Sequence, residues 1–543
     1  MSNRYQFETA FVKDYESYER LYDSELKKSI VRKIDLTSEW FEESPNGNYV
    51  SITDKNKRFN KHQGSGKKSW GKDGVFTPIE RKIRDTYWGK NYNKNPRIFY
   101  LDIETRTGTV TSGFPKPEDA LEPISLMQIY DNISNTMFIF GEREWKYEKL
   151  YEFDYDVKYY KCENELHIIE GFLKLFKALN PLIVYAWNGS GFDFPYIFNR
   201  FEKLGIDTAQ LSNFGKVTLK QNSMGFKIVY DLRSDGHMFI DLLDVYKKFT
   251  FGLKSSYSLD NIAFEELGKQ KVKHTEYEKF DDFYTGKYIH PKNPTDEQKS
   301  SRIFAASSKY IETQDERYLE LVRELAHSEF VYYGAIDTYL IKEIDNKKNF
   351  TSLMIMLAEK MGVLISETLG TVRPWSQYIS NIAYTNNEII ERPNNRFEGE
   401  IKVKGGRVTD PTVGLHKWVC SVDVNSMYPN TMRAFNMSPE KFTQIGQISQ
   451  TSKLRDILLS YFNDEDEDRR LNVPEHVMNN LETSLKEEGY CLGINGALFK
   501  TDEEGMVPKV IGDFYNERKS AKKTQFKYEK QKLLIKDILK ERK

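Results

Sequence analysis

Short apolar runs alternate with amphipathic runs between residues 97 and 350, and this alternation restricts the possible folds more than any other feature. RIFYLDIE (97–104) and PLIVYAW (181–187) are rich in β-branched and aromatic residues over strand-like lengths. LHIIEGFLKLFKAL (166–179) and FPYIFNRFEKL (194–204) place apolar residues at helical spacing. Strands that alternate with helices predict an α/β domain with a central sheet.

The bulk composition allows several such domains. A chain of 543 residues has room for three or four, and 39% hydrophobic with 30% charged residues is typical of a globular, soluble protein. The net charge of −1 means that any surface for nucleic acid must be local. The three cysteines are far apart and show no metal-ligand spacing, which favours a reducing compartment. We expect no signal peptide and no membrane span.

Carboxylates follow the two predicted strands. Asp102 and Glu104 are two residues apart in a strand, so their side chains share a face. Asp193 lies in the turn between PLIVYAW and the next helix, where ligands of α/β domains gather. Taken alone, the D-x-E pair is a common surface pattern, and Asp193 is better explained as a helix cap before Pro195.

A tyrosine and a fourth acidic residue occur on one helical face, since Tyr333 and Asp337 are four residues apart in VYYGAIDTYL. Four carboxylates that converge at a sheet edge can hold two divalent cations about 4 Å apart. Oxygen ligands suit Mg²⁺ or Mn²⁺. The combination predicts metal-assisted hydrolysis of a phosphodiester, with the tyrosine hydroxyl orienting the water.

FYLDIET, WN-x3-FD and Y-x3-D, in this order, resemble the three motifs of DEDDy-type 3′–5′ exonuclease domains, which have an RNase H-like fold. The similarity is greatest to family B DNA polymerases of T-even-like bacteriophages and includes SGFPKPEDALEPIS (112–125) and DLLDVYKKFTF-x5-YSLD (241–260). It implies that Asp102, Glu104, Asp193 and Asp337 serve the metal ions. It also implies that Tyr333 positions the water.

The resemblance also implies contacts with DNA. Asn188 would contact the primer terminus. KVTLKQNSMGFKIVYDL (216–232) resembles the family's β-hairpin that parts primer from template, with its turn expected at Asn222–Gly225. VKGGRV (403–408) is similar to a DNA-touching segment, where Gly405 and Gly406 would allow close approach to phosphate.

SVDVNSMYPNTM (421–432) resembles palm motif A of family B polymerases. Asp423, at the end of a strand expected over 416–424, would be a catalytic metal ligand. The backbone of Ser426 and Met427 would hold the triphosphate, and Tyr428 would exclude a 2′-hydroxyl.

A long basic helix is expected over 514–543, because this stretch has no Gly or Pro. On it, Arg518 and Lys522 lie four residues apart and match the family's triphosphate-gripping pair on a fingers helix.

The resemblance divides the chain into α/β and α+β domains. They are an N-terminal domain (1–96, rejoined by 351–395), the exonuclease domain (97–350), a partial palm with motif A (396–504) and the first fingers helix (505–543).

No second palm motif of the Y-x-D-T-D type and no K-x3-N-S-x-Y-G helix follows Met432. We therefore expect the N-terminal subunit of a split DNA polymerase, completed by a second chain that carries the remaining palm carboxylates and the thumb. Three alternatives remain open: a stand-alone exonuclease, a non-enzymatic nucleic-acid-binding or regulatory protein, and an artificially shortened chain.

The partners follow from the same resemblance. They are primer–template DNA, dNTPs, two Mg²⁺ or Mn²⁺ ions per active site, the second chain, and a sliding clamp reached through that chain. The setting would be the cytoplasm of a bacterial host cell.

Overall fold

The computed structural model groups the chain into two compact units, residues Met1–Ser38 with Phe76–Asn381, and residues Glu39–Val75 with Ile382–Lys543. The domain boundaries at residues 96, 350, 395 and 504 stay predictions. The structure describes residues 4–35, 38–52, 56–64, 76–111, 113–224, 227–390, 409–424, 426–461, 474–493 and 496–541.

An eight-stranded mixed sheet is the centre of the first unit. The inner strands run parallel from β7 through β11 to β14, and antiparallel strands extend the sheet at both sides. The α/β class predicted from the alternating pattern is therefore confirmed. In spatial order the strands are β10 (Asp156–Lys161), β9 (Thr136–Gly141), β8 (Ile124–Asp131), β7 (Ile98–Thr105), β11 (Ile183–Ala186), β14 (His237–Asp241), β13 (Lys227–Ser234) and β12 (Val217–Met224).

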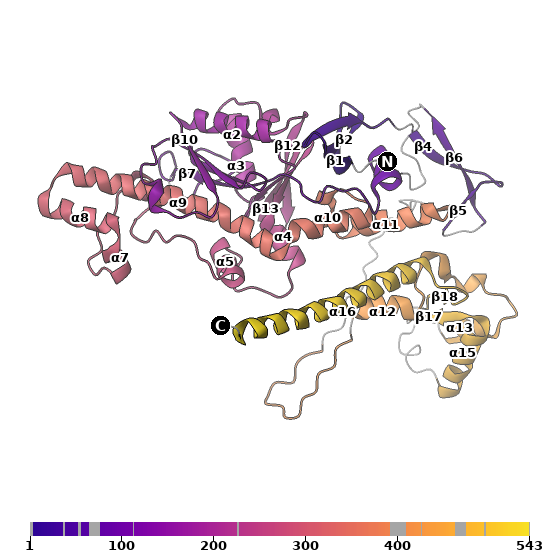
Figure 1. The fold of residues 1–543 in the computed structure, drawn as a ribbon. Coiled ribbons are helices and arrows are strands. Elements are labelled where there is room, and N and C mark those ends of the chain that lie inside the picture. Colours follow the sequence, from indigo (N-terminus) through magenta and orange to yellow (C-terminus); the bar gives the residue numbers. More distant parts are fainter. Residues whose placement is uncertain are drawn as a thin grey trace. The chain divides into compact units, whose positions relative to one another are not determined.

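Helices cover both faces of this sheet, and the alternation of side chains along β7 decides which face each residue meets. Phe99, Leu101 and Ile103 are buried in one core with residues of α2 (Glu165–Leu179) and α3 (Asp193–Lys203). The intervening positions, Asp102 and Glu104 among them, face the other side. There the 33-residue helix α9 (Glu316–Lys348) packs against β7 and β8. Figure 1 shows α2 and α3 on one side of the sheet and α9 on the other.

Local signals set the ends of these helices. Asn164 caps α2 by accepting a hydrogen bond from the His167 N–H, and the helix stops at Asn180 in the left-handed region. Asp315 caps α9 in the same way, and Asn349 ends it. The predicted helices over 166–179 and 194–204 are confirmed within one residue at each end.

A three-stranded antiparallel sheet, β1 (Tyr5–Lys13), β2 (Glu16–Asp23) and β3 (Lys28–Lys33), adjoins the large sheet. Arg20 of β2 is fully buried and forms an ion pair with Glu8 at 2.8 Å. Its other nitrogens donate to the carbonyl oxygens of Asn180 and Gly236, both at 2.7 Å. A buried guanidinium therefore fastens the small sheet to turns of the large one.

Shorter elements complete the first unit. They are α1 (Pro78–Lys82), η1 (Ile83–Tyr87), η2 (Glu148–Leu150), η3 (Thr208–Leu211), α4 (Leu242–Phe249), α5 (Leu259–Leu267), α6 (Phe280–Thr285), α7 (Asp296–Ser300), α8 (Arg302–Thr313), α10 (Phe350–Met361), η4 (Ile365–Leu369) and α11 (Val372–Thr385).

The second unit contains two small sheets and a set of helices. One sheet has the order β15 (Glu388–Ile389), β5 (Tyr49–Ser51), β6 (Arg58–Gly64), β4 (Ser38–Glu43), and the other has the order β16 (Phe442–Thr443), β18 (Leu498–Lys500), β17 (Tyr490–Leu492). The helical elements are α12 (Met427–Ala434), η5 (Pro439–Lys441), η6 (Ile445–Gln447), α13 (Lys453–Tyr461), α15 (Glu475–Glu488) and α16 (Met506–Glu541). None of the helices described in either unit is long and apolar enough to span a membrane.

The long basic helix predicted over 514–543 is confirmed as α16, which starts earlier, at Met506. The strand predicted over 416–424 is wrong, because this segment forms no strand and its side chains are exposed, Trp418 at 99% and Val422 at 88%. A strand needs a neighbour for its backbone N–H and C=O groups, and no described strand of the chain pairs with it.

The hairpin predicted over 216–232 is confirmed as β12 and β13, but its turn was placed too early. Asn222 lies within β12, opposite Val229, and the pairing continues to Met224 opposite Lys227. Gly225 lies outside the described residues.

Helix α9 can approach the sheet closely because position 334 is glycine. A Cβ atom on Gly334 would lie 1.9 Å from Nε2 of Gln128, a fully buried residue of β8. Gly-to-Ala normally stabilises a helix interior by about 1 kcal/mol. We expect Gly334→Ala instead to lower the free energy of unfolding by about 1–3 kcal/mol, because the buried Gln128 side chain would have to shift to admit the methyl group.

Urea unfolding of the purified chain would measure this change. Gly446→Ala is the control, because a Cβ there meets no atom within 4 Å. Gln128→Ala combined with Gly334→Ala should recover part of the loss. An unchanged midpoint in Gly334→Ala would contradict the close packing of α9 on β8.

Candidate active site

Three carboxylates meet between β7 and α9. Asp102 and Glu104 point from β7 toward the helix, and Asp337 points back from α9. Their oxygens lie within 4.8 Å of one another. Glu104 and Asp337 are 8% and 2% exposed. This is the only group of three or more His, Cys, Asp and Glu side chains with metal-ligand geometry in the part of the chain that the structure describes.

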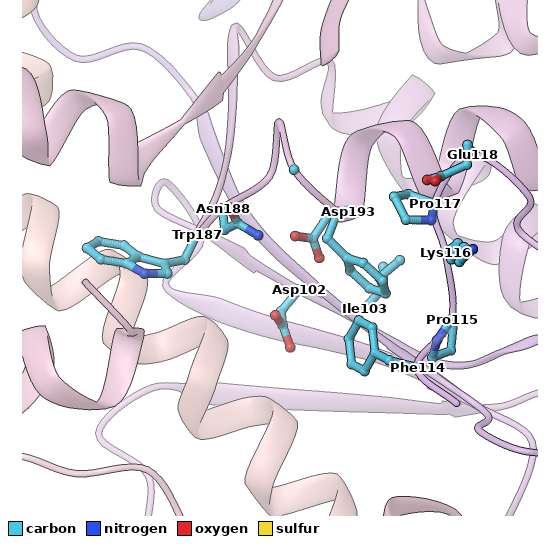
Figure 2. Close-up of a pocket in the computed structure, with 12 residues that line it drawn as sticks. Asp102, Ile103, Phe114, Pro115, Lys116, Pro117, Glu118, Trp187, Asn188 and Asp193 are labelled. Atoms are coloured by element: carbon cyan, nitrogen blue, oxygen red, sulfur yellow. The ribbon is translucent and has the colours of Figure 1, made fainter. Parts of the chain in front are cut away.

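Asp193 is the fourth acidic residue, at the first position of α3 and 5% exposed. It does not act as the helix cap, because the cap position is Phe192 and makes no side-chain hydrogen bond. Figure 2 shows Asp193 and Asp102 facing the same pocket, with Asn188 beside them. The pocket has a volume of about 560 Å³ and is lined by Asp102, Ile103, Phe114, Pro115, Lys116, Pro117, Glu118, Trp187, Asn188, Gly191, Phe192 and Asp193.

Burial and mutual repulsion favour the protonated forms of these acids. Burial together with the charge of Asp337 raises the pKa of Glu104 to about 8. Burial, with a smaller contribution from Asp241, raises the pKa of Asp193 to about 7. The pKa values of Asp102 and Asp337 are also raised, chiefly by burial. The site therefore has more acidic groups than it can ionise without added positive charge. Oxygen-only ligands suit Mg²⁺ or Mn²⁺, so the residues fit a divalent cation.

Tyr333 lies one helical turn before Asp337 and is 8% exposed. Burial and the charge of Glu104 raise the pKa of its hydroxyl, which stays protonated at neutral pH. Its ring packs edge-on against Phe280 and Phe283, with ring centres 6.0 Å away in both cases. The hydroxyl is thus held at a fixed place beside the carboxylates.

Lys271 joins this site and was not found from the sequence. Its ammonium forms an ion pair with Asp337 and donates to the Tyr333 hydroxyl at 3.0 Å. Burial opposes its charge, but Asp337 and the neighbouring carboxylates hold the pKa of Lys271 above its usual value. The residue lies in the irregular segment after α5, within the polar run KQKVKH, where no local pattern distinguishes it from its neighbours.

A second buried carboxylate orders the wall of the pocket opposite Asn188. Glu122 accepts hydrogen bonds from the backbone N–H groups of Thr109, Val110 and Thr111, at 3.1, 2.9 and 2.8 Å. Although burial opposes its charge, the hydrogen bond from the Thr109 hydroxyl, together with these N–H groups, holds the pKa of Glu122 at about 2. The segment that it fixes leads directly to Phe114 and the wall residues that follow.

The residues predicted for a polymerase site lie in the second unit. Asp423 is exposed in an irregular segment, and Ser426 has a left-handed backbone (φ 50°) immediately before α12. Met427 and Tyr428 open that helix and are 52% and 74% exposed. α12 packs against α16.

Arg518 and Lys522 are exposed on α16, one turn apart, as predicted. Asn222 is exposed on β12, away from the hairpin turn. Gly405 and Gly406 lie outside the described residues.

Comparison with known proteins gives the family. Residues 65–262 match the exonuclease domain of DNA polymerase family B, and residues 338–542 match DNA polymerase family B itself. The chain belongs to DNA polymerase family B. The resemblance found from the motifs is therefore confirmed.

Its phage relatives include the DNA-directed DNA polymerases of Escherichia phage RB69 and Enterobacteria phage T4. The first is 26% identical over 82% of this chain and 44% of the relative, and the second is 25% identical over 84% and 46%. The DNA polymerase of Thermococcus litoralis is 25% identical over 52% of this chain and 14% of the relative. This family B chain thus spans less than half the length of its phage relatives.

The raised pKa values of the acidic site in this family B chain imply that its affinity for metal ions depends on pH. Because Glu104 and Asp193 have pKa values of about 8 and 7 without metal, protons compete with a cation for their oxygens. We expect the affinity for Mn²⁺ to rise about tenfold or more between pH 6 and pH 8, with release of protons on binding.

Calorimetric titration with Mn²⁺ in two buffers of different ionisation enthalpy would measure both quantities. Asp102→Asn should remove the binding. A Mn²⁺ affinity that does not change with pH would contradict the coupling between the cation and these carboxyl groups.

Proposed function

We propose that this chain removes nucleotides from the 3′ end of DNA through a DEDDy-type site on an RNase H-like fold. Asp102, Glu104, Asp193 and Asp337 would be the ligands of two divalent cations, Mg²⁺ or Mn²⁺. The observation that supports this most strongly is the convergence of three carboxylates within 4.8 Å beside a buried tyrosine. The match of residues 65–262 to a family B exonuclease domain supports it independently.

Bound cations would supply an activated water and would stabilise charge on the leaving 3′ oxygen. The protein's own groups would place the substrate and the water. The Tyr333 hydroxyl accepts a hydrogen bond from the Lys271 ammonium beside Asp337, which fixes it where it would orient the water. Asn188 and Phe114 line the pocket and would contact the terminal nucleotide, Asn188 by hydrogen bonds and Phe114 by stacking on a base.

A gel assay tests this proposal directly. With a 5′-labelled primer–template, Mg²⁺ and all four dNTPs, we expect the purified chain to shorten the primer and not to extend it. Asp193→Ala should abolish the shortening while DNA binding remains, because it removes a metal ligand at the pocket. Glu202→Gln, an exposed acidic residue on the same helix, should behave as wild type.

The other outcomes are equally informative. Shortening that survives in Asp193→Ala would contradict the ligand assignment. An unchanged primer with intact DNA binding would instead favour a nucleic-acid-binding protein without activity.

Lys271 gives a second test. We expect Lys271→Met to lower kcat for 3′ degradation about 10- to 100-fold, with KM for the oligonucleotide unchanged, because Tyr333 and Asp337 lose the group that orients them. Lys273→Met is the matched control, since Lys273 is exposed two residues away. A kcat within twofold of wild type in Lys271→Met would rule out this role.

We further propose that the second unit contributes part of a nucleotidyl-transfer site for dNTPs and primer–template DNA. Asp423 would bind metal, Tyr428 would exclude ribonucleotides, and Ser426 with Met427 would hold the triphosphate through their backbone. Arg518 and Lys522 would grip its phosphates. The match of residues 338–542 to DNA polymerase family B supports this proposal.

One palm carboxylate is too few for two-metal catalysis, so the remaining ligands must come from other polymerase residues. The proposal assigns them to a second polymerase chain, which would also contact a sliding clamp. Together this chain and the second polymerase chain would form a proofreading polymerase in the cytoplasm of a bacterial host cell. Primer extension by these 543 residues alone, in the gel assay above, would contradict it.

A further inference from the structure

Asp241 is a buried carboxylate beside the pocket that the proposed metal chemistry does not use. It is the last residue of β14 and is 5% exposed. In the parallel pairing of β14 with β11 it lies opposite Ala186, the last residue of β11. The turn that carries Asn188 leaves the sheet at this point. Asp241 therefore lies where the backbone of the pocket wall begins.

Both oxygens of Asp241 accept hydrogen bonds from that turn. Oδ1 accepts from the backbone N–H of Asn188 at 2.9 Å, and Oδ2 accepts from the backbone N–H of Ser190 at 3.1 Å. Oδ1 also accepts from the N–H of Leu243 at 2.9 Å, which caps α4. One side chain thus has two separate tasks, holding the turn and capping a helix.

The turn that Asp241 contacts is sharply bent. Asn188 has a left-handed backbone (φ 61°), a conformation that asparagine adopts more readily than most residues. Its carbonyl oxygen accepts from the N–H groups of Gly191 and Phe192 at 2.9 and 3.0 Å, so the chain bends sharply after it. A Cβ on Gly191 would lie 2.7 Å from the Asn188 side chain. The Asn188 side chain is therefore placed by the backbone of its own turn.

We infer that Asp241 is a positioning residue of the exonuclease, which fixes Asn188 for contact with the terminal nucleotide and takes no part in metal binding. This inference rests on the function proposed above. Figure 2 shows Asn188 and Asp193 at the same pocket but on different parts of the turn. Asp193 is fixed separately, because Phe194 and Tyr196 of its own helix are buried in the core. Loss of the Asp241 contacts should thus loosen the substrate contact and leave the metal ligands in place.

Two substitutions separate the two tasks of Asp241. Asp241→Ser keeps an oxygen that can cap α4, since serine is a favourable N-cap, but it is too short to reach the turn as well. Asp241→Asn keeps the size and one acceptor, and turns an amide N–H₂ toward one of the donor N–H groups. Asp244→Asn is the matched control, an exposed carboxylate on the same helix.

The assay is degradation of a single-stranded oligonucleotide with Mg²⁺, at a temperature where each variant is folded by circular dichroism. For Asp241→Ser and Asp241→Asn we expect KM to rise about tenfold with kcat within about twofold of wild type. Mn²⁺ affinity, measured by calorimetry, should not weaken, because the metal ligands stay in place and loss of the Asp241 charge lowers the pKa of Asp193. Asn188→Ala should raise KM similarly, and the double variant Asp241→Ser/Asn188→Ala should be no worse than Asn188→Ala alone.

Each other result would overturn the inference. Unchanged KM in both Asp241 variants would show that the turn does not depend on this carboxylate. A fall in kcat together with weaker Mn²⁺ binding would place Asp241 among the metal ligands. Additive effects in the double variant would show that Asp241 does not act through Asn188. If wild type degrades no DNA at all, the proposed exonuclease function fails, which is a different result from any of these.

Discussion

The mutual repulsion of carboxylates confined between β7 and α9 is the constraint that the packing of the first unit has to overcome. Asp102, Glu104 and Asp337 are held within 4.8 Å of one another, and Glu104 and Asp337 are buried. Such an arrangement is unfavourable, and it persists only where the surrounding structure imposes it. The opposite face of β7 supplies that structure, since Phe99, Leu101 and Ile103 anchor the strand in a fully buried core. Gly334 contributes from the other side, because it lets α9 pack close enough to the sheet for Asp337 to lie beside Asp102 and Glu104.

Lys271 shows how the protein limits that repulsion. Its ammonium is the positive group that contacts Asp337, and it also binds the tyrosine hydroxyl. A single lysine cannot neutralise four carboxyl groups, so the pKa values of Glu104 and Asp193 remain raised. The site is therefore left with an affinity for further positive charge. Divalent cations would meet this need and would also perform the chemistry, which explains why an unfavourable cluster is kept.

Much of this arrangement could be predicted from the sequence because it depends on short-range periodicity. Spacing by two placed Asp102 and Glu104 on one face, and spacing by four did the same for Tyr333 and Asp337. Features set by long-range contacts were missed. Lys271 reaches the site from an irregular segment, and Asp241 is recognisable only when β11 and β14 are seen side by side. The strand expected over 416–424 fails for the same reason, since local composition favours a strand but cannot supply the neighbour that a strand requires.

The buried carboxylates of the first unit have two different positions, either among the proposed metal ligands or behind the pocket walls, and this difference indicates how the pocket is built. Burial raises the pKa values of Asp102, Glu104, Asp193 and Asp337, and Asp102 and Asp193 line the pocket. Glu122 and Asp241 are buried beside the pocket, and backbone N–H groups donate to their oxygens. Glu122 orders the segment that leads to Phe114, and Asp241 orders the turn that carries Asn188. Asp102 and Asp193 thus lie in the pocket itself, while Glu122 and Asp241 hold the two walls beside it.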